Sequence, residues 1–445
     1  MMQTVVFTIV SNNYLQYART LMRSLAAVHP GCRRFVCVAD KISAEDPTAS
    51  AAFQTVAAHN LPIPNFHDMA FRYDVMELNT AVKPFMFRWL LEDQGFDRAI
   101  YLDPDIFVYR PLTEVGALLD AGASGVLTPH IMRPLEDGGK PDDHDILQSG
   151  IYNLGFAAMT RQPEALAFLA WWGRRLQFQC YSDVRNNLFT DQRWCDFAPS
   201  FMPNLALLRH PGYNVAYWNL AHRKIEAGLD GAMTVNGEPL VFFHFSGLRF
   251  EEPKLVSRHQ QRLGWADLGN AQTLFSNYRQ AVMDNGWSES RKCPYAYDEV
   301  DGIRLSGPIR GLYRKRYPQH APKESCLDSA FIVRMCNQRV DIPAARGRVV
   351  VTELMKHVHG SRPDLQAAFN LETREGVLAF ARWFETIPCR EYGLDPRFTR
   401  QGLIGSLHVE PLPDAARDPI PNEGRSLLYR LWRKARKRLL GLGVR

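Results

Sequence analysis

The sequence lacks the short motifs that are typical of the commonest nucleotide-binding and redox sites. Neither Gly-x-Gly-x-x-Gly nor Gly-x-x-x-x-Gly-Lys-Ser/Thr occurs in the 445 residues, so neither dinucleotide nor P-loop phosphate binding is indicated. The eight cysteines include no Cys-x-x-Cys pair. In a chain without an export signal, such dispersed cysteines are typical of free thiols in a reducing cytoplasm.

Targeting and membrane-spanning segments are also missing. The first ten residues, MMQTVVFTIV, carry no basic stretch before their apolar run, which predicts a first strand rather than a signal peptide. No apolar run approaches the ~18 residues of a transmembrane helix. These absences predict a cytoplasmic protein, with peripheral attachment to the inner face of the membrane as the other location to test.

The body of the chain carries almost no net charge. Residues 425–445 hold six arginines, two lysines and no acid. Subtracting these eight charges from the total of +6 leaves −2 on residues 1–424. A nearly neutral body argues against nucleic acid as a partner.

What is present is the pattern of an α/β protein. The chain is 46% hydrophobic and 22% charged, as in globular proteins, and long enough for about two or three domains. Apolar runs over 5–10 and 34–40 flank a helical pattern over 14–28, which predicts a parallel sheet built from the N-terminus. We predict an α/β domain over 1–250, a mainly helical accessory region over 251–409 and a linker over 410–424.

Two acids follow directly on the apolar run 99–102. Pro104 of Asp103-Pro104-Asp105 cannot donate to a sheet ladder, so the acids stand at the carboxyl end of a strand, where ligands bind in open α/β sheets. Two carboxylates so close together repel unless a cation lies between them. A simple turn between two strands explains the same three residues.

Other polar residues stand at the ends or starts of predicted elements. Lys83 begins a predicted helix, where its charge opposes the helix dipole, and Asn153 interrupts an apolar strand predicted over 145–159. Asp191 precedes Gln192, and His244 ends an apolar strand over 237–247. Three of these residues have a simpler interpretation: Lys83 as a solvated lysine, Asp191 as a helix cap and His244 as a packed core histidine.

Taken in order, these pieces resemble the GT-A glycosyltransferases of family 8, the type of glycogenin and of bacterial lipopolysaccharide galactosyltransferases. The resemblance covers roughly residues 3–250 and rests on the first strand, the Lys83 helix and four short segments: Tyr-Leu-Asp-Pro-Asp-Ile, Tyr-Asn-Leu-Gly-Phe, Asp-Gln and His-Phe-Ser-Gly. It implies a GT-A (Rossmann-like) nucleotide-sugar domain with a mainly helical C-terminal extension.

The resemblance also implies roles for individual residues. Asp103, Asp105 and His244 would hold Mn²⁺ or Mg²⁺, a cation that neutralises the diphosphate leaving group of a nucleotide sugar. Lys83 would contact that diphosphate, and Asn153 and Asp191 would bind sugar hydroxyls, with Gln192 near the anomeric carbon. The remaining donor-site residues would be Thr8, Val10 and Tyr14 in a uridine pocket, and Gly247 beside the phosphates.

The function implied is transfer of a sugar from a nucleotide sugar, a UDP-sugar first of all, to a glycan or glycolipid acceptor in surface polysaccharide synthesis, with retention of anomeric configuration. Family members commonly follow the His-x-x-Gly segment with a phosphate-binding lysine, and this chain has Arg249 and Lys254 at other spacings. A nucleotidyltransferase of related fold and a non-catalytic glycan-binding or scaffold protein are the alternatives.

The basic segment 425–445 has an apolar stripe at helical spacing, formed by Leu428, Leu431, Trp432, Ala435, Leu439 and Leu442. A basic amphipathic helix containing tryptophan is typical of binding to anionic membrane surfaces. A terminal helix that is solvated or docked on the protein itself fits the same pattern.

Overall fold

A computed structural model describes residues 2–42, 52–229, 231–346 and 349–399. The predicted linker over 410–424 and the predicted amphipathic helix over 425–445 lie outside the described residues. The described residues divide into two compact units: those of 2–299 with Tyr317–Cys326 form the first, and Val300–Arg316 with the described residues of 327–399 form the second.

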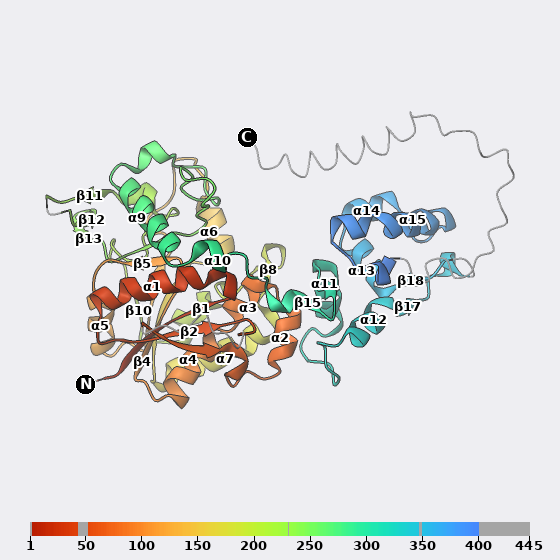
Figure 1. The fold of residues 1–445 in the computed structure, drawn as a ribbon, viewed down its shortest axis with the longest axis horizontal. Coiled ribbons are helices and arrows are strands. Elements are labelled where there is room, and N and C mark those ends of the chain that lie inside the picture. Colours follow the sequence, from red (N-terminus) through yellow and green to blue (C-terminus); the bar gives the residue numbers. More distant parts are fainter. Residues whose placement is uncertain (1, 43–51, 230, 347–348, 400–445) are drawn as a thin grey trace. The chain divides into compact units, whose positions relative to one another are not determined.

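A seven-stranded sheet forms the centre of the first unit, which confirms the predicted α/β class (Figure 1). β7 runs antiparallel to both of its neighbours, β4 and β6, and the other adjacent pairs are parallel. In spatial order the strands are β10 (Leu205–Leu207), β6 (Gly125–Pro129), β7 (Tyr152–Thr160), β4 (Arg98–Leu102), β1 (Thr4–Val10), β2 (Arg33–Val38) and β3 (Gln54–Ala57).

Helices cover both faces of this sheet, which explains why its central strands are almost wholly apolar. Val6 and Val10 share one hydrophobic cluster with Leu21 of α1 (Leu15–Val28). On the opposite face Phe7 packs edge-on against Phe87 of α4 (Lys83–Arg88), with ring centroids 4.8 Å apart. Other helices of this unit include α2 (Phe66–Arg72), α3 (Val75–Ala81), α5 (Thr113–Asp120), α7 (Pro163–Gln179), α8 (Ala198–Phe201) and α10 (Trp287–Ser290).

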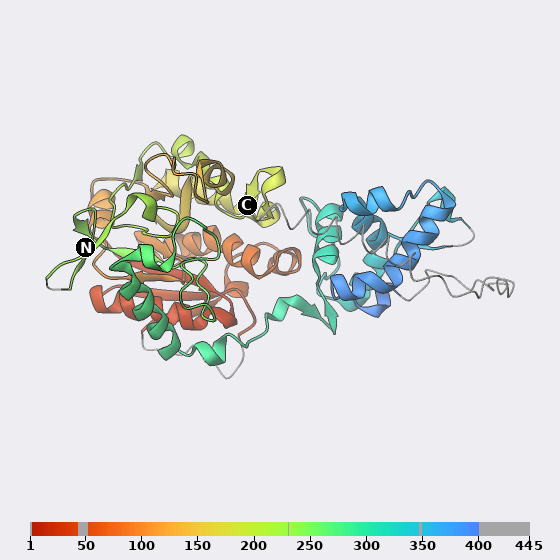
Figure 2. The ribbon, with the colours of Figure 1, turned by 90° about the horizontal axis from the view of Figure 1, so that it is seen from above.

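Residues 251–299 belong to the first unit rather than to a separate helical region. α9 (Ala271–Asp284) lies beside α1 (Figures 1 and 2), and Asn285 Nδ2 donates to Thr20 Oγ1 at 3.0 Å. Tyr278 stacks on Phe245 with ring centroids 3.9 Å apart. The division between the units therefore lies near residue 299, about fifty residues beyond the boundary predicted at 250.

The segment predicted as one strand over 145–159 holds two elements. α6 (Asp143–Ser149) comes first and β7 follows it. Asp142 begins the helix, because its carboxylate accepts from Asp145 N while the Asp145 carboxylate accepts from Asp142 N, each at 3.0 Å. Gly150, with φ +116°, ends the helix. The acid pair three residues apart is a helix-start signal that outweighs the apolar run after it.

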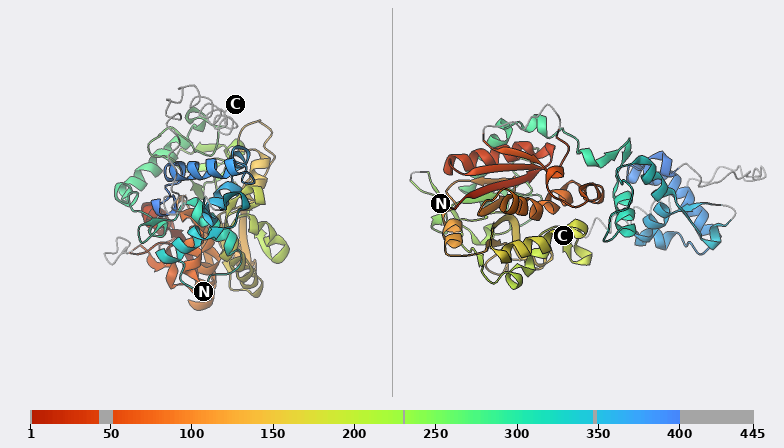
Figure 3. Two further views of the ribbon diagram at one scale, coloured as in Figure 1. Left: turned by 90° about the vertical axis from the view of Figure 1, so that its right-hand side faces the viewer. Right: turned by 90° about the horizontal axis from the view of Figure 1, so that it is seen from below.

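The second unit is mainly helical, as predicted for this part of the chain (Figure 3). Its core includes Ile309, Phe331, Leu354, Phe380 and Phe384, all buried. No helix in the described ranges combines the length and apolar character needed to cross a bilayer. The helices are α11 (Gly307–Arg316), α12 (Ser329–Asn337), α13 (Glu353–Gly360), α14 (Pro363–Ala368), α15 (Arg374–Glu391) and α16 (Pro396–Thr399).

Candidate active site

A cleft of about 550 Å³ opens at the carboxyl ends of β1 and β4 in the first unit. This volume lies within the range of roughly 300–1,000 Å³ that is typical of ligand pockets. The structure brings all but one of the predicted site residues to its wall: Val10, Tyr14, Lys83, Asp103, Asp105, Asn153, Asp191, Gln192, His244 and Gly247.

Thr8 is the exception. The side chains of a strand alternate between its two faces, and Thr8 shares the face of Val6 and Val10 that packs on α1. The Thr8 side chain is fully buried and its hydroxyl has no hydrogen-bond partner. The contact with a ligand that was predicted for Thr8 is therefore not supported, since the cleft wall at this point is formed by Ile9, Val10 and Ser11.

Two short strands outside the main sheet bring the predicted metal ligands together. β5 (Ile106–Val108) follows the Asp-Pro-Asp turn and pairs antiparallel with β14 (Phe242–His244), so that His244 lies opposite Ile106. Phe245 N donates to Asp105 O at 2.9 Å. His244 Nε2 consequently lies 2.9 Å from Asp105 Oδ1 and 3.6 Å from Asp103 Oδ2.

The chemistry of this trio fits a divalent cation. One ligand atom from each of Asp103, Asp105 and His244 lies within 4.8 Å of the others. Two carboxylates and one imidazole form a donor set that suits Mn²⁺, with Mg²⁺ as a possible substitute. Burial lowers the pKa of His244, but the charges of Asp105 and Asp103 outweigh burial and raise that pKa above its ordinary value. Burial also raises the pKa of Asp103.

Neighbouring side chains fix the orientation of the ligands. Tyr101 Oη donates to Asp103 Oδ1 at 2.6 Å, and burial raises the pKa of Tyr101 well above its usual value, so the phenol keeps its proton. His244 Nδ1 lies 3.3 Å from Asn214 Oδ1. When Nδ1 donates to that oxygen, Nε2 presents its lone pair to the carboxylate side, as metal coordination requires.

Gly155 leaves the space that the His244 imidazole occupies. A Cβ atom built on Gly155 would lie 2.7 Å from His244 Nδ1 and 2.8 Å from Asn153 Oδ1. Real Cβ atoms do not approach other atoms so closely, and the ring has little freedom because Trp218 packs edge-on against it at 5.2 Å. A glycine is therefore required here by the imidazole rather than by backbone conformation.

Lys83 and Asp191 form a buried ion pair behind the predicted metal ligands. Lys83 Nζ lies 2.5 Å from Asp191 Oδ2 and donates to Leu154 O at 2.8 Å. Burial lowers the pKa of Lys83, but Asp191 and Asp103 raise it above the ordinary value, so the ammonium stays charged. Much of its charge is thus balanced by Asp191, and the diphosphate contact predicted for Lys83 stays a prediction.

Asn153 and Gln192 contact each other, with Asn153 Nδ2 3.5 Å from Gln192 Oε1, and both form hydrogen bonds with the backbone of β7. Asn153 Oδ1 accepts from Asn214 Nδ2 at 3.0 Å and from Gly155 N at 3.1 Å. Gln192 Oε1 accepts from Leu154 N at 3.0 Å, and Gln192 Nε2 donates to Ser149 O at 2.8 Å. These bonds fix both amides at the cleft wall. Their predicted contacts with the sugar stay predictions.

Arg258 is a cleft residue that the sequence alone did not identify. Arg258 N donates to Gly247 O at 3.0 Å, which places the arginine beside the end of β14. A Cβ on Gly247 would approach within 2.5 Å of the His259 ring, so this close contact of the two segments needs glycine. Arg249 pairs with Glu252 at 2.8 Å, and neither Arg249 nor Lys254, the cations named from the sequence, is among the described residues that line the cleft.

The charge of Arg258 is available to a ligand. The side chain is exposed, its Nε donates to His259 Nε2 at 3.0 Å, and no carboxylate in the described part of the chain forms an ion pair with it. Arg258 lies fourteen residues after His244, in a stretch without regular secondary structure. Neither periodicity nor spacing could have indicated its place.

Comparisons with known proteins give distant similarities. No family model matches the chain. Two proteins of Bacillus subtilis (strain 168) are similar to it: Uncharacterized protein YfnF, 28% identical over 187 residues, and Uncharacterized protein YfnD, 24% identical over 268 residues. The matches cover 40% of this chain and 58% of YfnF, and 58% of this chain and 80% of YfnD. The chain thus spans a little over half the length of YfnF.

Among solved structures, one similar protein is the galactosyltransferase LgtC in complex with donor and acceptor sugar analogs. It is 15% identical, with a TM-score of 0.35, and the match covers 63% of this chain and 96% of the LgtC chain. The glycosyltransferase GlyE of Streptococcus pneumoniae TIGR4 is 14% identical, with a TM-score of 0.38, and the match covers 68% of this chain and 67% of the GlyE chain.

Proposed function

We propose that this protein is a metal-dependent glycosyltransferase of the GT-A type that transfers a sugar from a nucleotide sugar, a UDP-sugar first of all, to a glycan or glycolipid acceptor. The observation that carries the proposal is the convergence of Asp103, Asp105 and His244 at the wall of a cleft that also holds the Lys83–Asp191 pair and Arg258. Surface polysaccharide synthesis is the process we propose, on the resemblance of the sequence.

The predicted metal ligands and Arg258 supply the charge that a diphosphate needs. Asp103, Asp105 and His244 would hold Mn²⁺ or Mg²⁺, and the bound cation would neutralise the nucleoside diphosphate as leaving group. Arg258 adds a second cation at the cleft wall, and its planar guanidinium suits the bidentate binding of phosphate oxygens. In this proposal Arg258 takes the place of the family's phosphate-binding lysine.

The other side chains of the cleft bind and orient. Tyr14 lies against Tyr17 with ring centroids 4.8 Å apart, and both line the cleft next to β1. Their apolar faces suit a nucleobase, which stacks on aromatic rings. Asn153, Asp191 and Gln192 line the same cleft, and we assign them to the sugar on the resemblance of the sequence.

The carboxylates of the cleft favour retention of configuration. An inverting transferase requires an Asp or Glu free to deprotonate the acceptor hydroxyl. The acids among the described cleft residues are Asp103, Asp105 and Asp191. The first two belong to the predicted metal site and the third is paired with Lys83, so none of the three is free to act as that base.

Thermal unfolding tests the proposal. A UDP-sugar with Mn²⁺ should raise the melting temperature of the full-length protein, because a ligand that binds only the folded state stabilises it by mass action. Asp103→Ala should abolish this shift, and Asp93→Asn, which changes an exposed acid outside the cleft, should leave it unchanged.

Product analysis then separates the candidate reactions. Release of free UDP on addition of an acceptor glycan indicates glycosyl transfer, whereas release of diphosphate from a nucleoside triphosphate indicates a nucleotidyltransferase. Ligand binding without either release indicates a non-catalytic binding protein. Absence of a thermal shift with every nucleotide sugar would contradict the proposal as a whole.

A further inference from the structure

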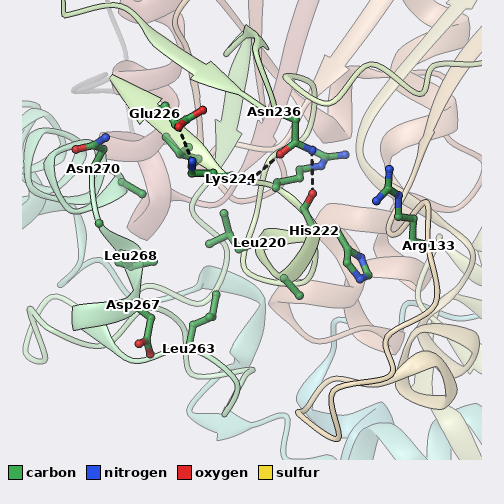
Figure 4. A pocket seen from close by; sticks show the side chains of 15 residues that line it. Arg133, Leu220, His222, Lys224, Glu226, Asn236, Leu263, Asp267, Leu268 and Asn270 are labelled. Carbon is green, nitrogen blue, oxygen red and sulfur yellow. Dashed lines mark hydrogen bonds and ion pairs between the residues drawn. The ribbon is translucent and has the colours of Figure 1, made fainter. Parts of the chain in front are cut away.

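The first unit contains a second cavity, separate from the cleft. Its volume is about 720 Å³, large enough for a sugar unit or two. Figure 4 shows Arg133 and His222 on one side of it and Asp267, Leu268 and Asn270 on the other. We call it the arginine cavity, after the Arg133 and Arg223 side chains that line it.

Arg223 is buried in the wall of this cavity without a counter-charge. Only 5% of its surface is exposed. Its Nη1 donates to Tyr213 O at 2.6 Å, whereas its Nε has no hydrogen-bond partner. No carboxylate of the described residues forms an ion pair with it. Burial lowers the pKa of Arg223 to about 9, so the guanidinium still carries its charge at neutral pH.

A buried charge without a counter-charge is costly to a folded protein. Neither of the two acids that line the arginine cavity, Glu226 and Asp267, forms an ion pair with Arg223. Lys224 Nζ and Glu226 pair with each other at 2.6 Å, and the Asp267 carboxylate accepts from Gly264 N at 2.8 Å. Arg133 is exposed and adds a second guanidinium. The cavity therefore offers two guanidinium groups to a ligand, while its lysine is already paired.

Two chain segments connect the arginine cavity with the cleft. His130 lines the cleft and Arg133, three residues later, lines the cavity. In the same way Trp218 lines the cleft and Leu220 lines the cavity. The cleft and the arginine cavity therefore lie within a few residues of each other along both segments.

We infer that the arginine cavity binds an oxyanionic group of a saccharide, either the carboxylate of an acidic sugar or a phosphate substituent, through Arg223 and Arg133. That this saccharide is the acceptor rests on the proposed function, whereas the binding of an oxyanion in this cavity does not. The bound anion supplies the counter-charge that Arg223 lacks, and guanidinium groups suit the planar, bidentate binding of such anions.

The test is a ligand-observed NMR titration of the full-length protein in EDTA, with no metal and no nucleotide present. The probes are glucuronate, inorganic phosphate and glucose. Glucuronate or phosphate should bind and glucose should not. Arg223→Gln should weaken anion binding about tenfold, as expected for loss of a charged hydrogen bond, and the exposed Arg133→Gln about threefold. Arg23→Gln, an exposed arginine of α1, is the matched control and should change nothing.

Each outcome decides the inference. Tighter binding of glucuronate assigns an acidic sugar, and tighter binding of phosphate assigns a phosphate substituent. No binding of either anion, or equal binding in wild type and Arg133→Gln, overturns the inference even if Arg223→Gln does not fold. Glucuronate binding should survive Asp103→Ala. Anion binding without nucleotide-sugar binding would overturn the proposed function and leave this site standing.

Discussion

Lys83 Nζ lies 2.5 Å from Asp191 Oδ2, and the two residues are separated by 108 positions in the chain. Both side chains are buried, so this bond fixes the start of α4 to the segment that carries Gln192. The pair also stands next to the predicted metal ligands, because Lys83 Nζ lies 4.2 Å from the centre of the Tyr101 ring and Tyr101 holds Asp103.

Lys83→Met should destabilise the protein by about 3–5 kcal/mol, because it leaves the Asp191 carboxylate buried without a counter-charge. Urea unfolding followed by tryptophan fluorescence measures the loss. The double variant Lys83→Met/Asp191→Leu removes both charges and should recover a large part of it. A cost below about 1 kcal/mol for the single variant would show that the pair is weakly coupled.

Gly155→Ala should weaken Mn²⁺ binding about 10- to 100-fold, as found when groups that orient metal ligands are changed. The added methyl group would displace the His244 imidazole, since it would stand 2.7 Å from Nδ1. Electron paramagnetic resonance of free Mn²⁺ measures the affinity. The control is Gly116→Ala in α5, where a Cβ meets no atom within 4 Å. Equal affinity in both variants would contradict the assigned ligand set.

Stability should depend on pH through His130. Burial lowers the pKa of this cleft histidine to about 4, while the unfolded chain has a value of about 6.5. The unfolded state therefore takes up a proton first as the pH falls. The stability due to neutral His130 is complete above pH ~6.5 and is lost between pH ~6.5 and ~4, by about 3 kcal/mol.

Urea unfolding of wild type and His130→Gln at a series of pH values checks this dependence. Glutamine keeps an acceptor for Asn153 Nδ2, which lies 3.1 Å from His130 Nε2, but it does not titrate. The difference in unfolding free energy between the two proteins should shrink as the pH falls from 7 to 4. A constant difference over that range would show that His130 does not titrate as described.

Arg258→Gln should raise the KM for the nucleotide sugar about tenfold, the effect of removing one charged hydrogen bond to a phosphate. Steady-state kinetics of UDP release measures it. Lys254→Gln is the matched control, because this exposed lysine lies four residues earlier and does not line the cleft. A larger effect of Lys254→Gln than of Arg258→Gln would reverse the assignment of the phosphate-side cation.

Local patterns were enough to predict much of the fold and the centre of the site. The apolar run before Asp103 and the proline after it determined a strand end, and the apolar run before His244 determined another. The acid pair Asp142 and Asp145 also signals a helix start, a local rule that the apolar residues after it obscured. Such signals act over a few residues, so each can be recognised from the sequence of one segment alone.

Contacts between distant segments decided the rest. The pairing of β5 with β14 sets His244 beside Asp105, and no local rule determines which strands pair. The same holds for Arg258 beside Gly247, for Asn214 behind His244 and for Arg223 buried without a carboxylate. The sequence by itself determined which residue types stand at the strand ends. Only the tertiary structure decided which of their charges are paired and which are free, because that depends on neighbours brought together by folding.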